Sequence, residues 1–231
     1  DELVRGAEHI LLITDQRADG DTYGSSLAFS EYLRSLGKRV SHYASSEIPD
    51  SLSFLPGIED TTYSKDVIVD PTVELAIVFD TSREDQINAL LAKRESKVPL
   101  IVFDHHKTNS GFGDVSIVDA TVSSTCELVH GYFIERKVTV TRDMAKCLIT
   151  GIMTDTRVFA NPLTKENSME IAAELLMAGG SIQNVVNNII MNYPLKRLQL
   201  WGRIFERIVK IPSLNLAVAY VTRADLNETG T

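Results

Sequence analysis

Cysteine is scarce in this sequence, and the signals of secreted and membrane proteins are missing. The two cysteines, Cys126 and Cys147, fall in stretches that we expect to be helical, and their spacing is not typical of a metal site. We therefore expect packing residues of a reduced intracellular protein, not a disulfide. No apolar run approaches the roughly 18 residues that span a membrane, and the N-terminus lacks the basic and apolar regions of a signal peptide. These absences predict a soluble cytoplasmic protein without a membrane partner.

Positive charge is also in short supply. The 231 residues include 23 lysines and arginines against 31 aspartates and glutamates, which gives a formal net charge of −8. This balance argues against a protein that grips long nucleic acid through a basic surface. It does not exclude an anionic substrate, because bound divalent cations can invert the charge of a local site. The length, with 44% hydrophobic residues, predicts one large globular domain or one and a half.

Short apolar runs predict the buried strands of an α/β fold. Residues 9–14, 75–79 and 100–103 are almost continuously apolar, which is typical of buried parallel strands. Segments with a helical spacing of apolar residues lie between and after them. The sequence therefore predicts a parallel sheet flanked by helices, with further strands at 39–43 and 115–118 and helices at about 24–36, 84–94, 124–136, 141–153, 165–178, 181–191 and 195–209.

Carboxylates and imidazoles follow the predicted strands. Ligands of open α/β sheets bind outside the carboxyl ends of the strands, so these side chains are expected to lie at the ligand-binding edge of the sheet. The candidates are Asp15, Asp19 and Asp21 after the first strand, Asp80 after the strand at 75–79, Asp104, His105 and His106 after the strand at 100–103, and Asp155 after an apolar helix.

Each candidate also has an ordinary structural explanation. Asp104 could cap a turn in a plain loop, and Asp155 could be an ordinary loop residue just past the end of a helix. The run Asp19-Gly20-Asp21 is a turn signal with a helix cap in its own right. Like charges so close together, however, repel one another unless they are protonated, solvated or shared by a cation. We therefore favour metal binding for the set as a whole.

The chemistry of these side chains indicates which metal ions the site would bind and which reaction it would catalyse. Carboxylate oxygens with one or two imidazoles suit Mn²⁺ or Mg²⁺ better than zinc. Seven or eight such groups are more than one cation needs, whereas two ions about 4 Å apart would use them. Such a pair binds a phosphoryl oxygen, generates a hydroxide at neutral pH and shields the developing charge, which predicts phosphoester hydrolysis. Ser25, Ser26 and the backbone N–H groups of the first helical turn could also receive a phosphate.

These motifs resemble the DHH phosphoesterase superfamily, which is named for the Asp-His-His seen here at 104–106. The chain is most similar to the small RecJ-like bacterial and archaeal members that act as nano-RNases and 3′-phosphoadenosine-5′-phosphate phosphatases. The similar segments follow the family order and cover residues 8–210; they stand at 17–28, 80–82, 104–109 with 112–114, 123–125 and 151–156.

The resemblance implies a role for each candidate. Asp15, Asp19 and Asp80 would hold one metal ion. The second ion would be held by a set that shares Asp80 as a bridge, namely Asp21, Asp80, His105 and Asp155. His106 would face the phosphate, and Asp104 would orient a histidine from behind. Catalysis would thus rest on His106, Asp80 and Asp104, with two Mn²⁺ ions as cofactors and Mg²⁺ as the alternative.

The sequence departs from the family pattern at several places. Asp15 stands where the family usually has His, and Ala18 where it usually has Pro. After the last motif the family usually carries Gly and a later Arg, whereas here Arg157 comes early; we take it as a substrate contact. We expect this chain to lack the family's C-terminal substrate domain, with its Gly-Gly-His motif. We expect a phosphoesterase domain at 1–190, a linker helix at 191–211 and the first strand of an incomplete domain at 212–231.

The leading hypothesis is a divalent-metal-dependent phosphoesterase that acts on short oligonucleotides or 3′-phosphoadenosine-5′-phosphate. The two-metal site follows from the residues, and the nucleotide substrate from the resemblance. A second copy of the chain, in a homodimer, is the other expected partner. One alternative is a catalytically weak or inactive nucleotide-binding member, suggested by Asp15 and the incomplete C-terminus. A pyrophosphatase or cyclic-dinucleotide phosphodiesterase shares the motifs, whereas a metal-free flavodoxin-like domain leaves the acidic cluster unexplained.

Overall fold

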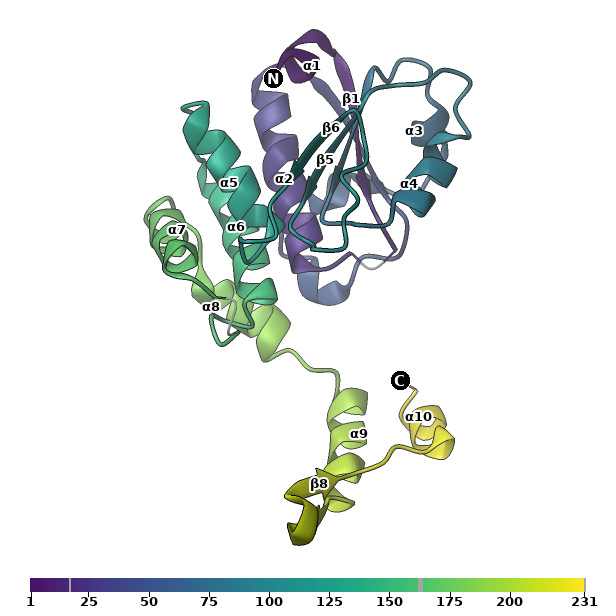
Figure 1. Ribbon diagram of the computed structural model, residues 1–231, viewed down its shortest axis with the longest axis vertical. Helices are drawn as coiled ribbons and strands as arrows, with labels where there is room; N and C mark the ends of the chain where they lie inside the picture. The colour runs from purple at the N-terminus through teal and green to yellow at the C-terminus, as the bar shows by residue number, and fades with distance from the viewer. Residues whose placement is uncertain (17, 162–163, 231) are drawn as a thin grey trace. The chain divides into compact units, whose positions relative to one another are not determined.

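The computed structural model describes residues 1–16, 18–161 and 164–230 (Figure 1). The chain divides into two compact units, Asp1–Val185 and a smaller one that begins at Val186. Arg17, the first residue of one segment that resembles the family, lies outside the described residues. None of the helices in the described ranges is long and apolar enough to cross a membrane.

A six-stranded parallel sheet forms the centre of the first unit. Its strands are β1 (His9–Thr14), β2 (Arg39–Ala44), β3 (Thr61–Thr62), β4 (Leu75–Phe79), β5 (Leu100–Asp104) and β6 (Val115–Val118). They lie in the order β3-β2-β1-β4-β5-β6, with parallel pairing throughout. The strand order reverses between β1 and β4, and the crevice at their carboxyl ends is the usual ligand position of such a sheet. The predicted parallel α/β fold is confirmed.

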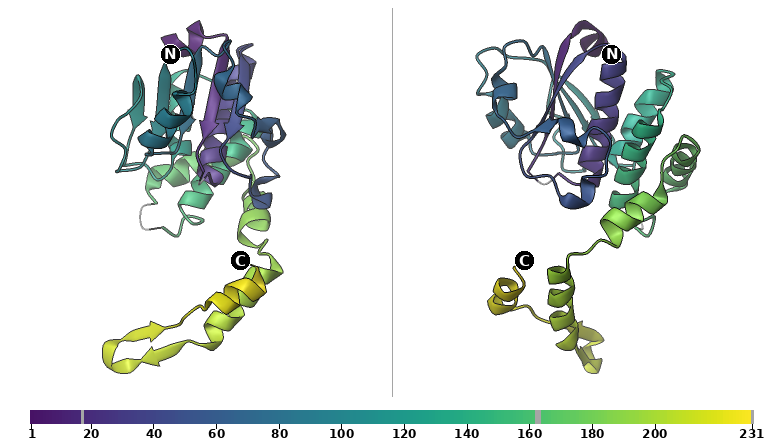
Figure 2. Two further views of the ribbon diagram at one scale, coloured as in Figure 1. Left: turned by 90° about the vertical axis from the view of Figure 1, so that its right-hand side faces the viewer. Right: turned by 180° about the vertical axis from the view of Figure 1, so that it is seen from behind.

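Helices cover both faces of this sheet. α2 (Gly20–Ser35), α5 (Thr125–Glu135) and α6 (Arg142–Asp155) lie on one face, and α3 (Asp66–Val69) and α4 (Glu84–Leu91) on the other (Figure 1, Figure 2). The short α1 (Glu2–Gly6) precedes β1, while α7 (Glu166–Met177) and α8 (Ile182–Val185) contact α6. α2 begins at Gly20 and not at residue 24 as predicted, because Asp19 caps it.

An apolar core on each face of the sheet holds the layers together. On the side of α3 and α4, Leu11 and Val102 belong to a buried cluster with Ile87 of α4. On the other side, Phe29 of α2 packs among aromatic rings, with its ring centroid 5.4 Å from that of Phe79. Burial of such rings contributes much of the stability of a domain of this size. The polar ends of the strands are therefore carried on a rigid, double-sided core.

Close contact between α2 and α6 requires glycine at two points. A Cβ atom on Gly24 would lie 2.5 Å from the backbone oxygen of Cys147. One on Gly151 would lie 2.2 Å from Cys126 Sγ and 2.7 Å from Asp21 Oδ1. Only glycine lets the two backbones approach so closely. The same contact brings the first turn of α2 beside the last turns of α6.

The second unit combines helices with a small hairpin. A π-helical turn (Val186–Ile190) and α9 (Leu195–Glu206) precede the antiparallel strands β7 (Val209–Ile211) and β8 (Leu216–Val218), and α10 (Arg223–Thr229) follows. β8 lies in the segment 212–231, where one strand is expected, and its partner β7 begins at Val209, the last residue of the helix predicted at 195–209. That helix stops at Glu206, because the β-branched residues Ile208, Val209 and Ile211 favour the extended strand that leads into a turn at Pro212.

Buried His42 of β2 predicts an acid-sensitive contribution to stability. Burial, reinforced by the charge of Arg34, lowers the pKa of His42 from 6.5 to about 4. Between pH 6.5 and about pH 4, His42 binds a proton in the unfolded chain but stays neutral in the folded chain. The free energy of unfolding should therefore fall by about 3 kcal/mol as the pH drops through this window. Urea titrations should show a shallower pH dependence for His42→Gln, and identical profiles for the two proteins would contradict this account.

Candidate metal centre

The candidate residues gather at the carboxyl ends of three neighbouring strands. Asp15 follows β1, Asp80 follows β4, and Asp104 is the last residue of β5, directly before the two histidines. α2 begins after the first of these loops, and the last residue of α6 is Asp155. Because β1, β4 and β5 are parallel neighbours, residues far apart in the chain meet at one edge of the sheet.

The imidazole of His105 lies among the carboxylates. Its Nε2 atom is 3.0 Å from Asp155 Oδ2, 3.6 Å from Asp80 Oδ1 and 3.9 Å from Asp21 Oδ2. Two overlapping triads, each with ligand atoms within 4.8 Å of one another, are Asp21–His105–Asp155 and Asp80–His105–His106. Although Asp155 is close, His105 Nε2 is buried and has no well-formed hydrogen bond to any described residue. A buried ring nitrogen that faces three carboxylates matches the environment of a metal ligand.

Asp21 is fixed by the start of α5. Its carboxylate is fully buried and accepts hydrogen bonds from the backbone N–H of Thr125 at 2.6 Å and of Cys126 at 2.9 Å. Ser124 caps the same helix end by accepting a hydrogen bond from the backbone N–H of Glu127. An anion at a helix N-terminus is favourably placed in the field of the helix dipole. The helix therefore holds this carboxylate in place without supplying a counter-ion.

Asp80 is held by two threonine hydroxyl groups. Its backbone is left-handed, with a φ of 58°, and its N–H donates to Phe103 O at 2.8 Å. Thr22 Oγ1 donates to one carboxylate oxygen at 2.7 Å, and Thr125 Oγ1 donates to the other at 3.2 Å. Left-handed backbone is uncommon in residues other than glycine and clusters at functional sites. The strained position and the two donors together fix the carboxylate beside His105.

The carboxylates of this centre repel one another. Burial and the charge of Asp155 raise the pKa of Asp19, and burial with Asp155 and Asp19 raises the pKa of Asp21 well above its usual range. Burial, followed by the neighbouring aspartates, does the same to the pKa of Asp80. A divalent cation would relieve this repulsion. Carboxylate oxygens with an imidazole are donors that Mn²⁺ and Mg²⁺ accept, so the residues fit the predicted metal site.

His106 and Asp104 form a hydrogen-bonded pair beside the triads. Asp104 is fully buried; its Oδ1 accepts a hydrogen bond from His106 Nδ1 at 2.7 Å, and its Oδ2 accepts one from Asn109 Nδ2 at 2.6 Å. The bond to Asp104 raises the pKa of His106. Burial alone would raise the pKa of Asp104, but the donors His106 and Asn109 outweigh it and lower that pKa. The His106 side chain remains 47% exposed, in contrast to the fully buried Asp104.

Replacing Asp104 by Asn should lower the pKa of His106. The amide keeps the shape of the side chain but removes the negative charge that stabilises the imidazolium. An NMR titration of the metal-free protein should show His106 losing its proton at lower pH in the variant, while the distant His130 titrates as before. An unshifted His106 would contradict the role that we assign to Asp104.

Asp15 and Asp19 stand apart from the two triads. Asp15 is buried, accepts a hydrogen bond from Thr81 Oγ1 at 3.0 Å and lines a neighbouring hollow. Asp19 caps α2, with its Oδ1 accepting hydrogen bonds from the backbone N–H of Asp21 and Thr22. Neither carboxylate joins a triad of ligand atoms within the described residues. Their metal-binding roles therefore stay predictions.

Ser25 and Ser26 point into α2 and not into the site. Both are fully buried; Ser25 Oγ donates to Asp21 O at 2.7 Å, and Ser26 Oγ donates to Tyr23 O at 3.3 Å. Helices α5 and α6 cover α2 on the side away from the sheet, so a substrate cannot reach these hydroxyl groups. The expectation that they bind phosphate is corrected: they satisfy the carbonyl groups of their own helix.

Arg157 opens a left-handed turn directly after α6. The φ angles of Arg157, Val158 and Phe159 are 51°, 58° and 63°. The buried hydroxyl of Thr156 accepts a hydrogen bond from the backbone N–H of Phe159 at 3.0 Å and helps to hold this turn. Consecutive left-handed residues other than glycine are strained. The Arg157 side chain is exposed, and its predicted substrate contact stays a prediction.

The sequence did not reveal the residues that hold the carboxylates. Thr22 and Thr125 bind Asp80, Thr81 binds Asp15, and Asn109 binds Asp104. All four lie within segments that resemble the family. Their position in these segments marked them as candidates for a role in the site. The sequence did not show which carboxylate each of them would contact.

The parallel sheet is open, and its carboxylate and imidazole centre lies where the strand order reverses. These features define an α/β protein built to bind metal ions. Within this class the chain belongs to the DHH family: residues 9–152 match the family's N-terminal domain. The expected family membership is confirmed.

Curated relatives agree with this assignment, and a solved structure shares the fold. The chain is 29% identical over 227 residues to the bifunctional oligoribonuclease and PAP phosphatase NrnA of Bacillus subtilis, covering 96% of this chain and 69% of that protein. It is 29% identical over 199 residues to the protein of the same name from Thermus thermophilus, covering 86% and 59%. The chain thus spans 59% to 69% of the length of these two relatives. An exopolyphosphatase-related protein from Bacteroides fragilis shares the fold, with a TM-score of 0.88 at 24% identity over 99% of this chain and 70% of that one.

Proposed function

We propose that the protein is a divalent-cation-dependent phosphoesterase. The observation that carries the proposal is the buried Nε2 of His105, which lies within 3.9 Å of carboxylate oxygens from Asp21, Asp80 and Asp155. Such a set is unfavourable without a cation, and paired cations in such sets promote the displacement of phosphoryl groups. Membership of the DHH family and the phosphatase and oligoribonuclease relatives support the same reaction class.

In this proposal Asp21, Asp80, His105 and Asp155 would hold one cation, and Asp15, Asp19 and Asp80 would hold a second, so that Asp80 would contribute to both. When bound, the cations polarise the phosphoryl group and activate the attacking water. The hydroxyl groups of Thr22 and Thr125 keep the Asp80 carboxylate in position.

His106 is the protein's own group for meeting the substrate. Because Nδ1 is bonded to the Asp104 carboxylate, the proton on that nitrogen is fixed and Nε2 is directed to the substrate. The raised pKa of His106 favours the imidazolium, which donates to a phosphoryl oxygen or passes its Nε2 proton to the leaving oxygen. The lowered pKa of Asp104 keeps that carboxylate ionised.

We infer that the substrates are short oligonucleotides or 3′-phosphoadenosine-5′-phosphate. The names of the Bacillus and Thermus relatives supply both substrate types. A net charge of −8 suits a short substrate that is held by bound cations and a few local groups, not by a long basic surface. The homodimer and the cytoplasmic location stay predictions.

The deciding experiment measures metal uptake and turnover on the same sample. Metal-stripped protein should take up Mn²⁺ saturably, followed by electron paramagnetic resonance of the free ion. It should then hydrolyse an RNA dinucleotide or 3′-phosphoadenosine-5′-phosphate, and only with Mn²⁺ added. Absence of Mn²⁺ uptake would overturn the metal centre, and uptake without hydrolysis of either compound would overturn the substrate class.

A further inference from the structure

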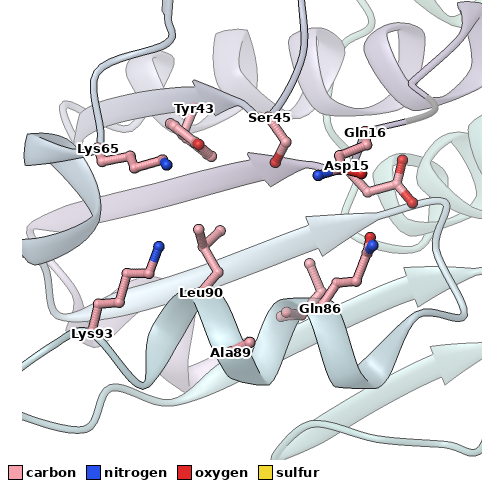
Figure 3. A pocket seen from close by; sticks show the side chains of 10 residues that line it. Asp15, Gln16, Tyr43, Ser45, Lys65, Gln86, Ala89, Leu90 and Lys93 are labelled. Atoms are coloured by element: carbon pink, nitrogen blue, oxygen red, sulfur yellow. The ribbon is translucent and has the colours of Figure 1, made fainter.

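The two sides of the metal centre differ in how the protein closes them. On the side of α4, Asp15 lines a hollow between the strand ends and that helix (Figure 3). On the other side, the first turn of α5 contacts two candidate ligands directly. The N–H groups of Thr125 and Cys126 donate to Asp21. Thr125 Oγ1 donates to Asp80. A shift of this one turn would therefore displace both carboxylates.

Glu127 lies in the same turn and bonds to a second helix. It stands three residues after the capping Ser124, a pattern in which a glutamate usually bonds back to the N–H of the capping residue. In this protein the Glu127 Oε1 atom accepts a hydrogen bond from Ser123 Oγ. It also accepts one from Ser168 Oγ at 2.7 Å. Because Ser168 belongs to α7, the carboxylate joins the start of α5 to that helix.

The side chains of Glu127, Ser123 and Ser168 form a buried anchor between the two helices. Glu127 is 4% exposed, Ser123 is 7% exposed, and Ser168 is fully buried. The two hydroxyl oxygens lie 3.0 Å apart, beside the carboxylate oxygen that both contact. A buried carboxylate is unfavourable unless it is hydrogen-bonded, so the two hydroxyl groups favour this one arrangement of the helices.

A second contact between α5 and α7 is exposed and should matter less. His130 Nε2 lies 3.3 Å from Glu174 Oε2, but the Glu174 side chain is 62% exposed. Water competes for such a contact, and polar pairs at the surface contribute little to stability. The buried Glu127 anchor is therefore the stronger of these two polar connections.

α7 is also linked through the chain to the last candidate ligand. Asp155 ends α6, and the segment that follows it leads to α7, which begins at Glu166. α7 packs against α6 and α5 on the side away from the sheet (Figure 1). Lys165, directly before α7, donates from Nζ to the backbone oxygen of Thr121, which precedes α5. The end of α6 and the start of α5 are thus held to one common element.

We propose that Glu127 is a positioning residue of the metal centre. By bonding to Ser168 of α7, it fixes the first turn of α5. That turn in turn keeps Asp21 and Asp80 in the arrangement that binds a cation. The metal-binding part of this inference rests on the proposed function, whereas the anchoring of the turn does not.

Amide hydrogen exchange of the metal-free protein, followed by NMR, tests the anchor by itself. E127A removes the acceptor of both serines, so the N–H groups of Thr125 and Cys126 should exchange at least about tenfold faster. E127Q keeps an oxygen at the same position and should retain most of the protection. The N–H of Val78, in the centre of the sheet, reports global unfolding and should change less. Unchanged exchange at Thr125 and Cys126, or equal acceleration at Val78, would overturn the anchor.

A matched control and a second variant make this result specific. E174A removes a carboxylate from the exposed contact between the same two helices, and Thr125 and Cys126 should then exchange as in the wild type. Equal acceleration in E174A would show that any loosening of α7 is sufficient and would overturn the role of Glu127. S168A deletes one donor and should give a smaller acceleration. It carries the test if E127A does not fold, and unchanged exchange in S168A would then overturn the anchor.

Mn²⁺ titration separates the positioning role from the proposed function. E127A should bind Mn²⁺ about 10- to 100-fold more weakly than the wild type, as is typical when a partner of a metal ligand is lost. E127Q should bind Mn²⁺ almost as tightly as the wild type. If E127A binds Mn²⁺ as tightly as the wild type, the positioning role is wrong although the proposed function stands. If the wild type takes up no Mn²⁺, the proposed function is wrong, and the amide exchange still decides whether Glu127 anchors the turn.

Discussion

Replacing Asp80 by Asn is expected to abolish metal-dependent turnover. The Asp80 carboxylate lies within 3.7 Å of ring nitrogens of both His105 and His106. Among the described residues, it is the one side chain that accepts hydrogen bonds from the hydroxyl groups of both Thr22 and Thr125. An amide of the same shape cannot bridge two cations. The loss in kcat/KM should reach at least about a thousandfold, beyond the 10- to 100-fold typical of an outer partner of a metal ligand. Steady-state kinetics at saturating Mn²⁺ measures it.

Thermal unfolding provides a second readout for Asp80→Asn. Mn²⁺ should raise the Tm of the wild-type protein by binding the folded state, and this rise should be lost in the variant. Asp143→Asn is the matched control, because Asp143 lies at the start of α6 and, among the described residues, forms an ion pair with Lys146 alone. It should retain both turnover and the Mn²⁺ response. Metal-dependent turnover that survives in Asp80→Asn would refute the bridging role.

Gly151→Ala is expected to damage both the fold and the metal centre. Its new methyl group would overlap Cys126 Sγ of α5 and approach Asp21 Oδ1 of α2 to 2.7 Å, so α6 must move away from both helices. Overpacking of this kind costs about 1 to 3 kcal/mol. Because Asp21 lies in the clash, Mn²⁺ affinity should fall as well. Urea denaturation of the metal-free protein and Mn²⁺ titration measure the two effects.

A control and a rescue make the Gly151 result specific. Gly131→Ala adds the same methyl group to α5 where nothing lies within 4 Å, and it should leave the protein equally stable or more so. Adding Cys126→Ala to Gly151→Ala removes the sulfur from the clash and should restore much of the stability. Mn²⁺ affinity should recover less, since the contact with Asp21 remains. Equal losses in Gly151→Ala and Gly131→Ala would show that the close helix contact does not matter.

The sheet was predictable because its strands are buried on both faces. A strand covered by helices on either side must be apolar throughout, as Ile10–Ile13 and Leu75–Phe79 are, and such runs are visible in the sequence. The parallel order then brings the residues that follow each strand to one edge. This is why Asp80 and His105 were expected to meet, and they lie 3.6 Å apart.

The surroundings of the carboxylates were not predictable in the same way. The N–H groups of Thr125 and Cys126 reach Asp21 only because α5 packs beside α2, more than one hundred residues along the chain. Ser25 was misjudged for a related reason. α2 has the sheet on one side and two helices on the other, so small polar residues that resemble a solvent-facing surface are buried and bond to their own backbone.

The candidate metal ligands come from distant segments of the chain. The complete site therefore forms only when the whole domain has folded. Asp21 and Asp80 are available once α2 and the sheet have formed, but Asp155 arrives only when the end of α6 packs against α2. An unfolded or partly folded chain therefore offers no complete site, and a cation adds its binding free energy to the finished domain alone. A cation that binds after the last helix has docked slows unfolding and leaves the rate of folding almost unchanged. In the cell, the supply of metal would then determine how long a folded molecule lasts and not how quickly it forms.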